Sequence, residues 1–369
     1  MGTYGRPLFG RATRAMSRRV VWGCLVAAIV TVVLPPRVAA QQPAAPPGWE
    51  VPRTAYGYPD LQGNWSNATI TPIQRPNGQE PTLSAAEVAE IEGRREAVIE
   101  EEAQASDPDR VAPPVGGDGS TGAAGGVGGY NYFWIDAGDR VAVVNGEYRS
   151  SLITNPPNGR VPPMTPAAVE RRRASFAGAS RGGQYDNPES RPAAERCIVS
   201  FGSNAGPPML PNYFYNNNYT IVQTPDNVMI MTEMVHDVRV IRLGGRTNPL
   251  PSQLRPYFGD SWGHWAGDTL VVETTNISPE QSFQGAPATA EAKVVERFTR
   301  AGPNTLNYEF TVIDPTTFVA EWGGTLPYNR QPGQVYEYAC HEGNYAMQNV
   351  LSGARAQEAR EAAQNDQPR

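Results

Sequence analysis

Eight short runs of β-branched and aromatic residues fill the second half of this 369-residue chain, and turn-forming residues separate each run from the next. Runs of this length, bounded by Gly, Pro, Asn or Asp, predict strands joined by turns. Because the strands follow one another with little helix between them, we expect a mainly β fold, either an antiparallel curled sheet or a barrel of about eight strands. The runs span residues 219–224, 227–234, 238–243, 269–275, 293–300, 305–313, 318–322 and 334–340.

The rest of the chain is predicted to add a few peripheral helices and long loops. Residues 82–105 predict a helix, because Ser84 and Glu87 have the spacing of a capping box. The Gly- and Pro-rich segment 107–129 has almost no large apolar residue and is expected to be a mobile loop. Further helices are predicted at residues 165–176 and 344–363, and further strands at 130–135, 140–144 and 149–154.

The first 40 residues predict export. Residues 1–19 carry arginine but no acid, residues 20–34 are almost wholly apolar, and Val38-Ala39-Ala40 has the small residues of a signal peptidase site. We therefore expect a cleavable signal peptide at 1–40 and a periplasmic or secreted mature protein. Ser17-Arg18-Arg19 partly matches a twin-arginine signal, which leaves that route open beside the ordinary one. Met16 is an alternative start.

The mature chain is expected to hold one domain. A Pro- and Ala-rich flexible leader is predicted at 41–58, followed by a single β-rich domain at 59–369. No later segment has the run of about twenty apolar residues that a membrane-spanning helix needs, so we expect no stable membrane insertion after signal removal.

Two cysteines remain after the signal is removed. In an oxidising compartment, Cys197 and Cys340 are expected to form a disulfide. The alternative is two unrelated buried thiols. There is no cysteine pair of the CxxC type, which excludes zinc-ribbon and iron–sulfur sites.

The charge pattern limits the classes of binding partner that we expect. The net charge is −6 and Lys293 is the sole lysine, so there is no basic patch with interleaved aromatic residues. Nucleic acid is therefore not an expected partner, and we expect a small-molecule ligand or substrate instead.

The three histidines of the chain all lie in short motifs with carboxylate neighbours, and all fall in the predicted sheet. Histidine is the usual proton carrier near neutral pH and a common metal ligand. We therefore expect at least two of His236, His264 and His341 to share one site.

His264 lies between Trp262 and Trp265, just before a tight turn at 266–268 that leads into the predicted strand 269–275. Indole rings on both sides would remove the imidazole from water and keep it a neutral base. Asp260 and Asp268 are close enough in sequence to orient it. The alternative is a structural histidine that bonds a turn carbonyl.

The other two histidines also sit at predicted strand ends. His236 lies near a bend with Glu233 and Arg239, which either line a cavity or form a cross-strand ion pair. His341 and Glu342 follow a predicted strand and precede the last helix. There they either project over a barrel mouth or cap the helix.

Two classes of function fit these motifs. The first is an exported enzyme, a lyase, isomerase or hydrolase, that performs acid–base chemistry on a small organic substrate such as a sugar derivative or an aromatic compound. His264 or His341 would move the proton, with His236 as a further candidate. The assisting groups would be Asp260, Asp268 or Glu342 to set the tautomer, Arg239 to hold negative charge, and Tyr345 as a second acid.

The second class is a non-catalytic barrel that binds a small ligand. Trp262, Trp265 and Trp322 would stack on the ligand, and Glu233 would contribute a polar contact. No cofactor is predicted, and no spacing matches a familiar metal or nucleotide motif. A divalent metal is a further alternative, with His236, His264 and His341 as its ligands.

Five motifs stand out along the chain: PDLQGNW at 59–65, SLITNPPNGR at 151–160, ERC at 195–197, HWAGDTLVVET at 264–274 and YACHEGNY at 338–345. In these motifs the chain resembles a large family of uncharacterised exported bacterial proteins, which brings no established activity and no catalytic residue. In strand count the chain also resembles calycin-type barrels, whose interior or mouth holds one small ligand.

Overall fold

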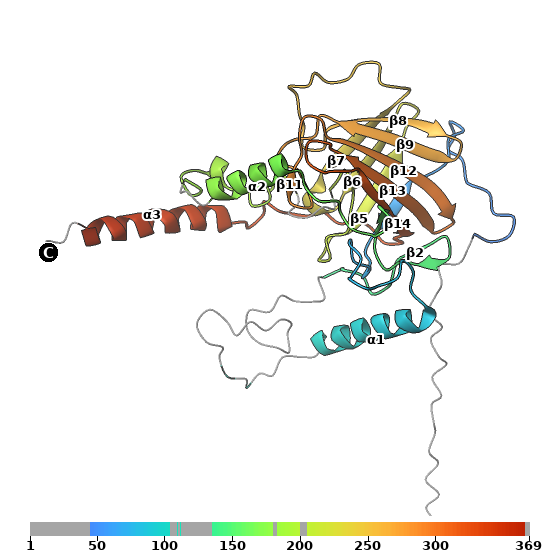
Figure 1. The fold of residues 1–369 in the computed structure, drawn as a ribbon, viewed down its shortest axis with the longest axis horizontal. Helices are drawn as coiled ribbons and strands as arrows, with labels where there is room; N and C mark the ends of the chain where they lie inside the picture. The colour runs from blue at the N-terminus through green and yellow to red at the C-terminus, as the bar shows by residue number, and fades with distance from the viewer. Residues whose placement is uncertain are drawn as a thin grey trace, which may run out of the picture. The chain divides into compact units, whose positions relative to one another are not determined.

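A sheet of ten strands is the main element of the computed structural model, which describes residues 45–103, 109, 111, 135–179, 183–199 and 205–365 (Figure 1). Nine strands follow one another in the order β1-β5-β6-β7-β8-β9-β12-β13-β14, and β1 also pairs with β14. These nine strands therefore form a closed barrel. The tenth strand, β4, pairs with the first residues of β14. The mainly β barrel predicted from the sequence is confirmed.

The element bounds are as follows. The barrel strands are β1 (Gly63–Ser66), β5 (Asn218–Gln223), β6 (Asn227–Thr232), β7 (Val238–Leu243), β8 (Asp260–Ala266), β9 (Thr269–Thr275), β12 (Lys293–Gly302), β13 (Thr305–Ile313) and β14 (Trp322–Arg330). The other strands are β2 (Val143–Val144), β3 (Glu147–Tyr148), β4 (Ile153–Asn155), β10 (Ser282–Phe283) and β11 (Ala286–Pro287). The helices are α1 (Ala85–Glu102), α2 (Pro166–Ala179) and α3 (Ala346–Asn365), with short 3-10 turns η2 (Pro188–Ser190) and η3 (Met234–His236).

One strand pair departs from the expected antiparallel pattern. β7 and β8 are parallel, with Ile241 opposite Ser261 and Leu243 opposite Gly263. The reason lies in residues 244–259, which lead the chain from the end of β7 back to the level of its middle, where Ser261 lies opposite Ile241. All other barrel pairs are antiparallel, so the barrel is mixed.

Strict alternation places one face of each long strand inside the barrel. In β12 and β13 every second residue is buried, as expected for a sheet with one face on the core. The inward side chains are large. Trp65, Tyr219, Phe298, Tyr308 and Tyr328 are each fully buried, so side chains fill the interior as in other small barrels. Ligand binding is therefore to be sought at the barrel ends.

A buried ion pair crosses this interior. The Arg239 guanidinium on β7 donates to both carboxylate oxygens of Glu296 on β12, at 2.7 and 2.9 Å. The Tyr308 hydroxyl donates to the same carboxylate at 2.8 Å and accepts from the Met209 backbone N–H at 2.9 Å. Two buried charges are stable in such a place only when paired and hydrogen bonded, as these are.

Several predicted strands were found with the expected bounds. The runs at 238–243, 269–275 and 305–313 coincide with β7, β9 and β13, and Pro225-Asp226 lies in the β5–β6 turn. The predicted strand at 318–322 was wrong except for Trp322, which begins β14. The backbone oxygen of Asp314 accepts from the backbone N–H groups of Thr317 and Phe318 and holds the start of this run in a turn. The run at 334–340 pairs with no described strand, and Tyr336 is exposed.

The helices were predicted more closely. Ser84 and Glu87 form the predicted capping box of α1. The predicted helices at 165–176 and 344–363 correspond to α2 and α3, although α3 has no buried residue. The predicted signal at 1–40, the first residues of the leader and nearly all of the loop at 107–129 lie outside the described residues. Among the helices that are described, none combines the length and apolar character needed to cross a bilayer.

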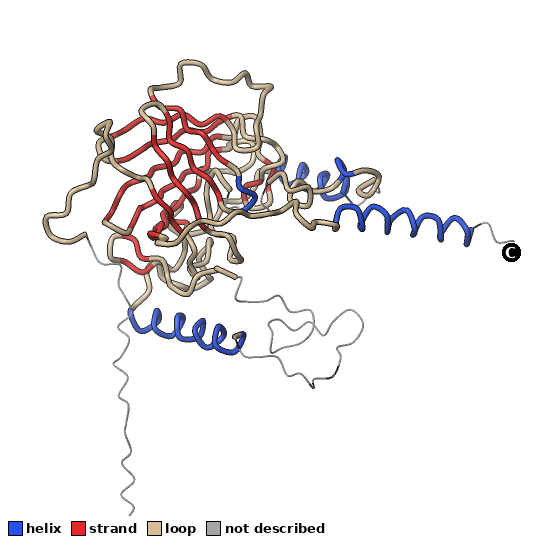
Figure 2. Tube along the Cα trace, turned by 180° about the vertical axis from the view of Figure 1, so that it is seen from behind, coloured by secondary structure: helices blue, strands red, loops and turns tan. Residues whose placement is uncertain are grey.

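The strand directions define two ends of the barrel, each built from loops (Figure 2). At one end lie the start of β5, the β6–β7 connection and the start of β8; we call it the Glu233 end. At the other lie the β5–β6, β8–β9 and β12–β13 turns, the end of β14 and the start of β1; we call it the Arg330 end.

Candidate functional site

The Glu233 end carries a buried carboxylate in a strained turn. Glu233 is 9% exposed, and one of its carboxylate oxygens accepts from the Asn218 side-chain amide at 2.8 Å. Two residues later, Val235 has a φ of 65°. A β-branched residue rarely adopts this left-handed conformation, and such strain concentrates at functional sites. The Glu233 turn is therefore a candidate site.

An asparagine-rich segment before β5 fixes the surroundings of Glu233. The Asn217 side chain donates to the backbone oxygen of Asp136 at 2.8 Å and accepts from the Asn212 backbone N–H at 3.1 Å. In the same segment Asn216 has a φ of 59°. Because neighbouring residues 217 and 218 bind Asp136 and Glu233, this segment holds both acids at one place.

The carboxyl group of Asp136 holds its proton more tightly than an ordinary aspartic acid does. Although Asp136 is exposed as a residue, desolvation of its carboxyl group raises its pKa from 3.8 to about 6. The charges of Glu233 and Asp139 raise the pKa further in the same direction. Neighbouring acids in unlike environments can divide the roles of proton donor and proton acceptor between them.

Aromatic rings lie at the same end. The rings of Phe214 and Tyr215 have centroids 4.4 Å apart, and Tyr215 stacks with Tyr338 at 6.5 Å. All three residues are half-buried. The Tyr215 contact places the segment that follows β14 beside the Glu233 end, and ring faces of this kind suit sugars and aromatic compounds.

The predicted disulfide lies on this segment. Cys197 and Cys340 are bonded, with their Cα atoms 5.8 Å apart. The Asn344 side chain lies 3.4 Å from the Cys197 sulfur. The bond therefore ties the loop around residue 197 to the segment that carries His341.

His264 is placed differently from the prediction. Gly263 faces the core, because a Cβ there would meet Ile241, Leu243 and Leu270. Side chains alternate along a strand, so His264 points to the outer face of the barrel, where it is exposed. The expectation that two tryptophans enclose this imidazole was wrong.

The other residues of the His264 motif have structural partners. Asp260 is an acceptor for Arg242 and for the Leu250 backbone N–H, so it does not orient His264. Asp268 pairs with Arg53. These carboxylates hold loops and strand ends in place.

The three predicted stacking tryptophans are also engaged. Trp262 is 8% exposed and its ring is covered by the Arg242 guanidinium, 4.1 Å from the ring centroid. Trp265 stacks on Tyr58 at 5.6 Å, and Trp322 is fully buried in the core. Trp322 therefore does not contact a ligand, and Trp262 and Trp265 already serve as packing surfaces.

Arg239 differs from the prediction as well. Its bidentate partner is Glu296 in the barrel interior, and Glu233 is instead bonded by Asn218. The cross-strand pair of Arg239 with Glu233 was wrong. The guanidinium is occupied by a buried carboxylate and is not free to hold a substrate anion.

The remaining predicted residues lie near the Glu233 end. His236 belongs to η3 in the β6–β7 connection, and His341, Glu342 and Tyr345 are exposed in the segment before α3. His264 lies at the Arg330 end, because β8 runs parallel to β7. The three histidines therefore do not converge, and no set of three His, Cys, Asp or Glu residues suited to a metal ion occurs within the described ranges.

Sequence reasoning missed Asp136 and Asn218. Asp136 lies between the strands predicted at 130–135 and 140–144, and the asparagines before β5 match no known motif. The available signal was the concentration of Asn and Tyr at residues 212–219 directly before a strand, because such side chains bond loop backbone.

Comparison of the chain with protein-family models, curated proteins and solved structures gives no match. The function is therefore argued from the site.

Proposed function

We propose that this protein is an enzyme that performs acid–base chemistry on a small organic substrate at the Glu233 end. The observation that carries the proposal is the pair formed by Glu233, a buried carboxylate bonded by Asn218, and Asp136, whose pKa is raised to about 6. Two acids held by one segment in different environments supply a base and an acid for the same substrate.

The charge of the site favours a neutral substrate. Glu233 and Asp139 both act electrostatically on Asp136 there, and the buried Arg239 guanidinium is occupied by Glu296. An anionic substrate would be repelled, whereas a sugar derivative or aromatic compound can stack on the half-buried rings of Phe214, Tyr215 and Tyr338. Because residues 1–40 predict export, we propose that such a compound is met outside the cytoplasm.

The proposed steps use two side chains. Glu233 accepts a proton from carbon or oxygen of the substrate, while Asn218 keeps its carboxylate oriented through the Nδ2–Oε2 hydrogen bond. Asp136 in its protonated form returns a proton to the other side of the reacting group. This division suits a lyase or an isomerase, in which one proton leaves and another is delivered.

Proton exchange with solvent tests the proposal without a known substrate. The mature protein is incubated in D2O with a panel of neutral sugars, keto sugars and phenolic carbonyl compounds, and deuterium incorporation or turnover is followed by NMR. We expect at least one compound to react with the wild type, and Glu233→Gln and Asp136→Asn to lose that reaction.

His264→Ala is the matched control, because this residue lies exposed at the opposite end of the barrel. It is expected to retain full activity. If no compound reacts faster with wild type than with Glu233→Gln, the proposal fails. A compound that binds without exchange would then favour the alternative of a non-catalytic ligand-binding barrel.

A further inference from the structure

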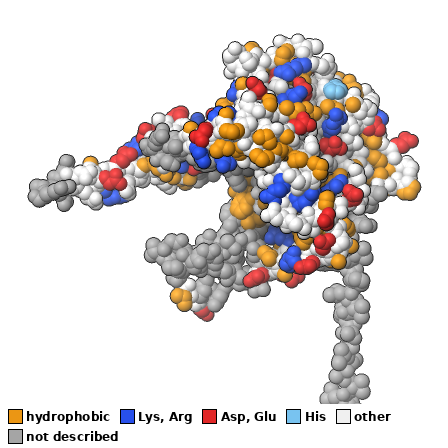
Figure 3. All heavy atoms as spheres, in the orientation of Figure 1, with side chains coloured by type: hydrophobic (Ala, Val, Ile, Leu, Met, Phe, Trp, Pro, Cys, Tyr) orange, Lys and Arg blue, Asp and Glu red, His pale blue; other side chains and the backbone are white. Residues whose placement is uncertain are grey.

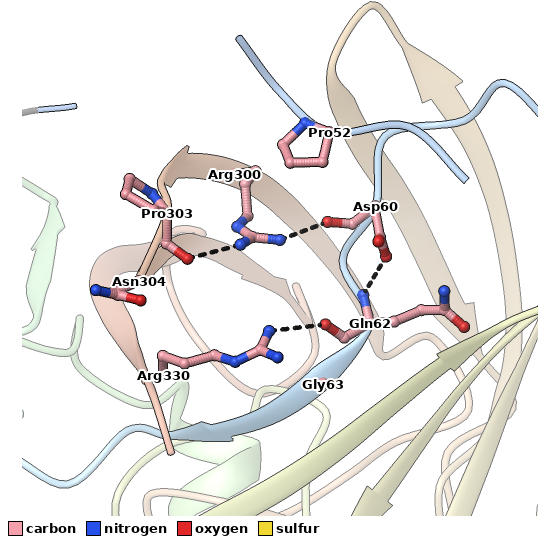
Figure 4. A pocket seen from close by; sticks show the side chains of 8 residues that line it. All are labelled: Pro52, Asp60, Gln62, Gly63, Arg300, Pro303, Asn304 and Arg330. Atoms are coloured by element: carbon pink, nitrogen blue, oxygen red, sulfur yellow. Dashed lines mark hydrogen bonds between the residues drawn. The ribbon is translucent and has the colours of Figure 1, made fainter. Parts of the chain in front are cut away.

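A pocket of about 560 Å3 opens at the Arg330 end (Figure 4). Its walls come from three distant parts of the chain: the segment before β1, the β12–β13 turn and the end of β14. Pockets of this size hold small organic ligands. The pocket contains two arginines, Arg300 and Arg330, and we call it the arginine pocket.

Arg300 is built into the pocket wall. It is 9% exposed, and its guanidinium donates to three backbone oxygens, those of Gly302, Asp60 and Pro303, at 3.0, 2.8 and 2.7 Å. Its carbon Cζ also lies 5.0 Å from the centroid of the buried Trp65 ring. Burial lowers the pKa of Arg300, and the charge of Arg330 lowers it further. The fold therefore holds the Arg300 guanidinium in a place where burial and the charge of Arg330 both disfavour its charged form.

Arg330 lies beside it on the same indole ring. Its Cζ is 5.4 Å from the Trp65 centroid, and one amino group donates to the backbone oxygen of Gln62 at 3.1 Å. Figure 4 shows both guanidinium groups directed toward the segment that contains Asp60 and Gln62. The two guanidinium groups thus lie against the same Trp65 ring and beside the same segment, which contains Asp60 and Gln62.

Neither cation has a carboxylate partner within ion-pair distance among the described residues. A guanidinium has five N–H donors. Arg300 uses three of them, which leaves two, and Arg330 uses one, which leaves four. Two adjacent cations with spare donors in a pocket form an anion-binding arrangement.

Gly63 makes this arrangement possible. Its φ of 128° is strained for any residue with a side chain, and a Cβ there would lie 2.4 Å from the Arg330 Nη1 atom. Only glycine at this position lets the Arg330 guanidinium rest against the backbone of β1. A substitution that adds one methyl group would therefore displace Arg330 without changing any charge.

Asp60 narrows the choice of anion. One of its carboxylate oxygens accepts from the Gln62 backbone N–H at 2.9 Å, and its charge acts on Arg300. A dianionic phosphate would be repelled by Asp60 more strongly than a carboxylate. The second Asp60 oxygen can accept a hydroxyl group of the ligand. The arrangement therefore suits a carboxylate that carries hydroxyl groups nearby.

We propose that the arginine pocket binds the carboxylate of a small hydroxylated organic acid, such as a sugar acid, through Arg300 and Arg330. This site is separate from the Glu233 end, because the filled barrel interior lies between them. Its ligand is anionic, whereas the proposed substrate of the Glu233 end is neutral. The two proposals can therefore fail independently.

Calorimetric titration of the mature protein at low salt provides the test. The probes are D-gluconate, its neutral analogue sorbitol and inorganic phosphate. We expect gluconate to bind and sorbitol not to bind. Arg330→Gln and Gly63→Ala should each weaken gluconate binding at least tenfold, because each removes or displaces one guanidinium fork.

Arg297→Gln is the matched control. Arg297 is exposed on the same strand as Arg300, and its substitution removes the same charge from the molecule as Arg330→Gln does. It should leave gluconate binding within twofold of wild type, and circular dichroism should show every variant folded. Equal gluconate affinity in Arg330→Gln and wild type overturns the proposal. So does tighter binding of phosphate than of gluconate, or no heat of binding at about 10 mM gluconate.

Discussion

The two ends of the barrel have opposite chemistry although both are built from turns between strands of the same sheet. At the Glu233 end, desolvation raises the pKa of an acid, Asp136. At the Arg330 end, burial lowers the pKa of a base, Arg300. The net charge of −6 predicts neither sign, and the surface in Figure 3 shows acidic and basic side chains interspersed over the visible face. The kind of ligand that suits each end therefore depends on the charged side chains at that end, and not on the net charge of the protein.

The interior separates the two ends. Arg239 and Glu296 neutralise each other inside the barrel, and aromatic side chains fill the space around them. Because this pair belongs to neither end, its removal should damage both, whereas a change at one end should leave the other intact. Three variants test this comparison.

Glu296→Ala should have the largest effect. It leaves the buried Arg239 guanidinium without its carboxylate, and breaking a buried pair in this way costs about 3 to 5 kcal/mol. The free energy of unfolding in urea should fall by that amount, and reactivity at the Glu233 end and gluconate binding at the Arg330 end should decline together. Glu309→Ala, on the exposed face of β13, should change stability by less than about 0.5 kcal/mol. An equal effect of both variants would contradict the role of the pair.

Asp136→Asn should have an intermediate effect that depends on pH. The folded-state pKa is raised from 3.8 to about 6, so the folded protein binds the proton more tightly than the unfolded chain does. The contribution of Asp136 to the stability of the wild type should therefore fall as the pH rises from about 4 to about 6 and stay level above that range. Asp136→Asn removes this fall.

Urea unfolding at pH 4, 5, 6 and 7 measures the effect. The gain in stability of Asp136→Asn over wild type should grow from pH 4 to pH 6 and stay level from pH 6 to pH 7, and gluconate binding should not change. Asp139→Asn is the comparison variant: it should reduce the fall without removing it, because the Asp139 charge is only one contribution to the raised pKa of Asp136. A stability difference between Asp136→Asn and wild type that does not depend on pH would contradict the raised pKa of Asp136.

Asp268→Asn should have the smallest effect. Its partner Arg53 is about half exposed, and such surface pairs contribute at most about 1 kcal/mol. Because this pair and the stacking of Tyr58 on Trp265 hold the segment before β1, hydrogen exchange of residues 53–58 should become faster. His264→Ala, in the same hairpin, should leave that exchange unchanged. Faster hydrogen exchange at the Glu233 end of this variant would contradict the claim that the two ends of the barrel are independent.

Sequence patterns predicted elements that depend on near neighbours. The strand runs at 293–300 and 305–313, the capping box of Ser84 and Glu87 and the disulfide of Cys197 with Cys340 were all expected and are present. β8 was not predicted as a strand, because Asp260 and Gly263 are residue types that strands disfavour. The Gly-Gly-Thr-Leu-Pro part of β14 escaped prediction because Gly and Pro are disfavoured in the same way.

The candidate sites depended on long-range pairing. His264 looked functional because tryptophans flank it in sequence, yet alternation turns it outward and its two tryptophans pack on Arg242 and Tyr58. Asp136 and Glu233 gave no joint signal, since they meet only through neighbouring asparagines of a third segment.

The sequence by itself determined a mainly β fold and predicted its disulfide, because short β-branched and aromatic runs and the turn residues between them act over a few positions. Only the tertiary structure decided that the sheet closes into a barrel and which turns share an end. Closure of the barrel by β1 against β14 brings Gly63 beside Arg330 and both beside Arg300. That meeting is fixed by strand register around the whole sheet, and no local pattern in the sequence records it.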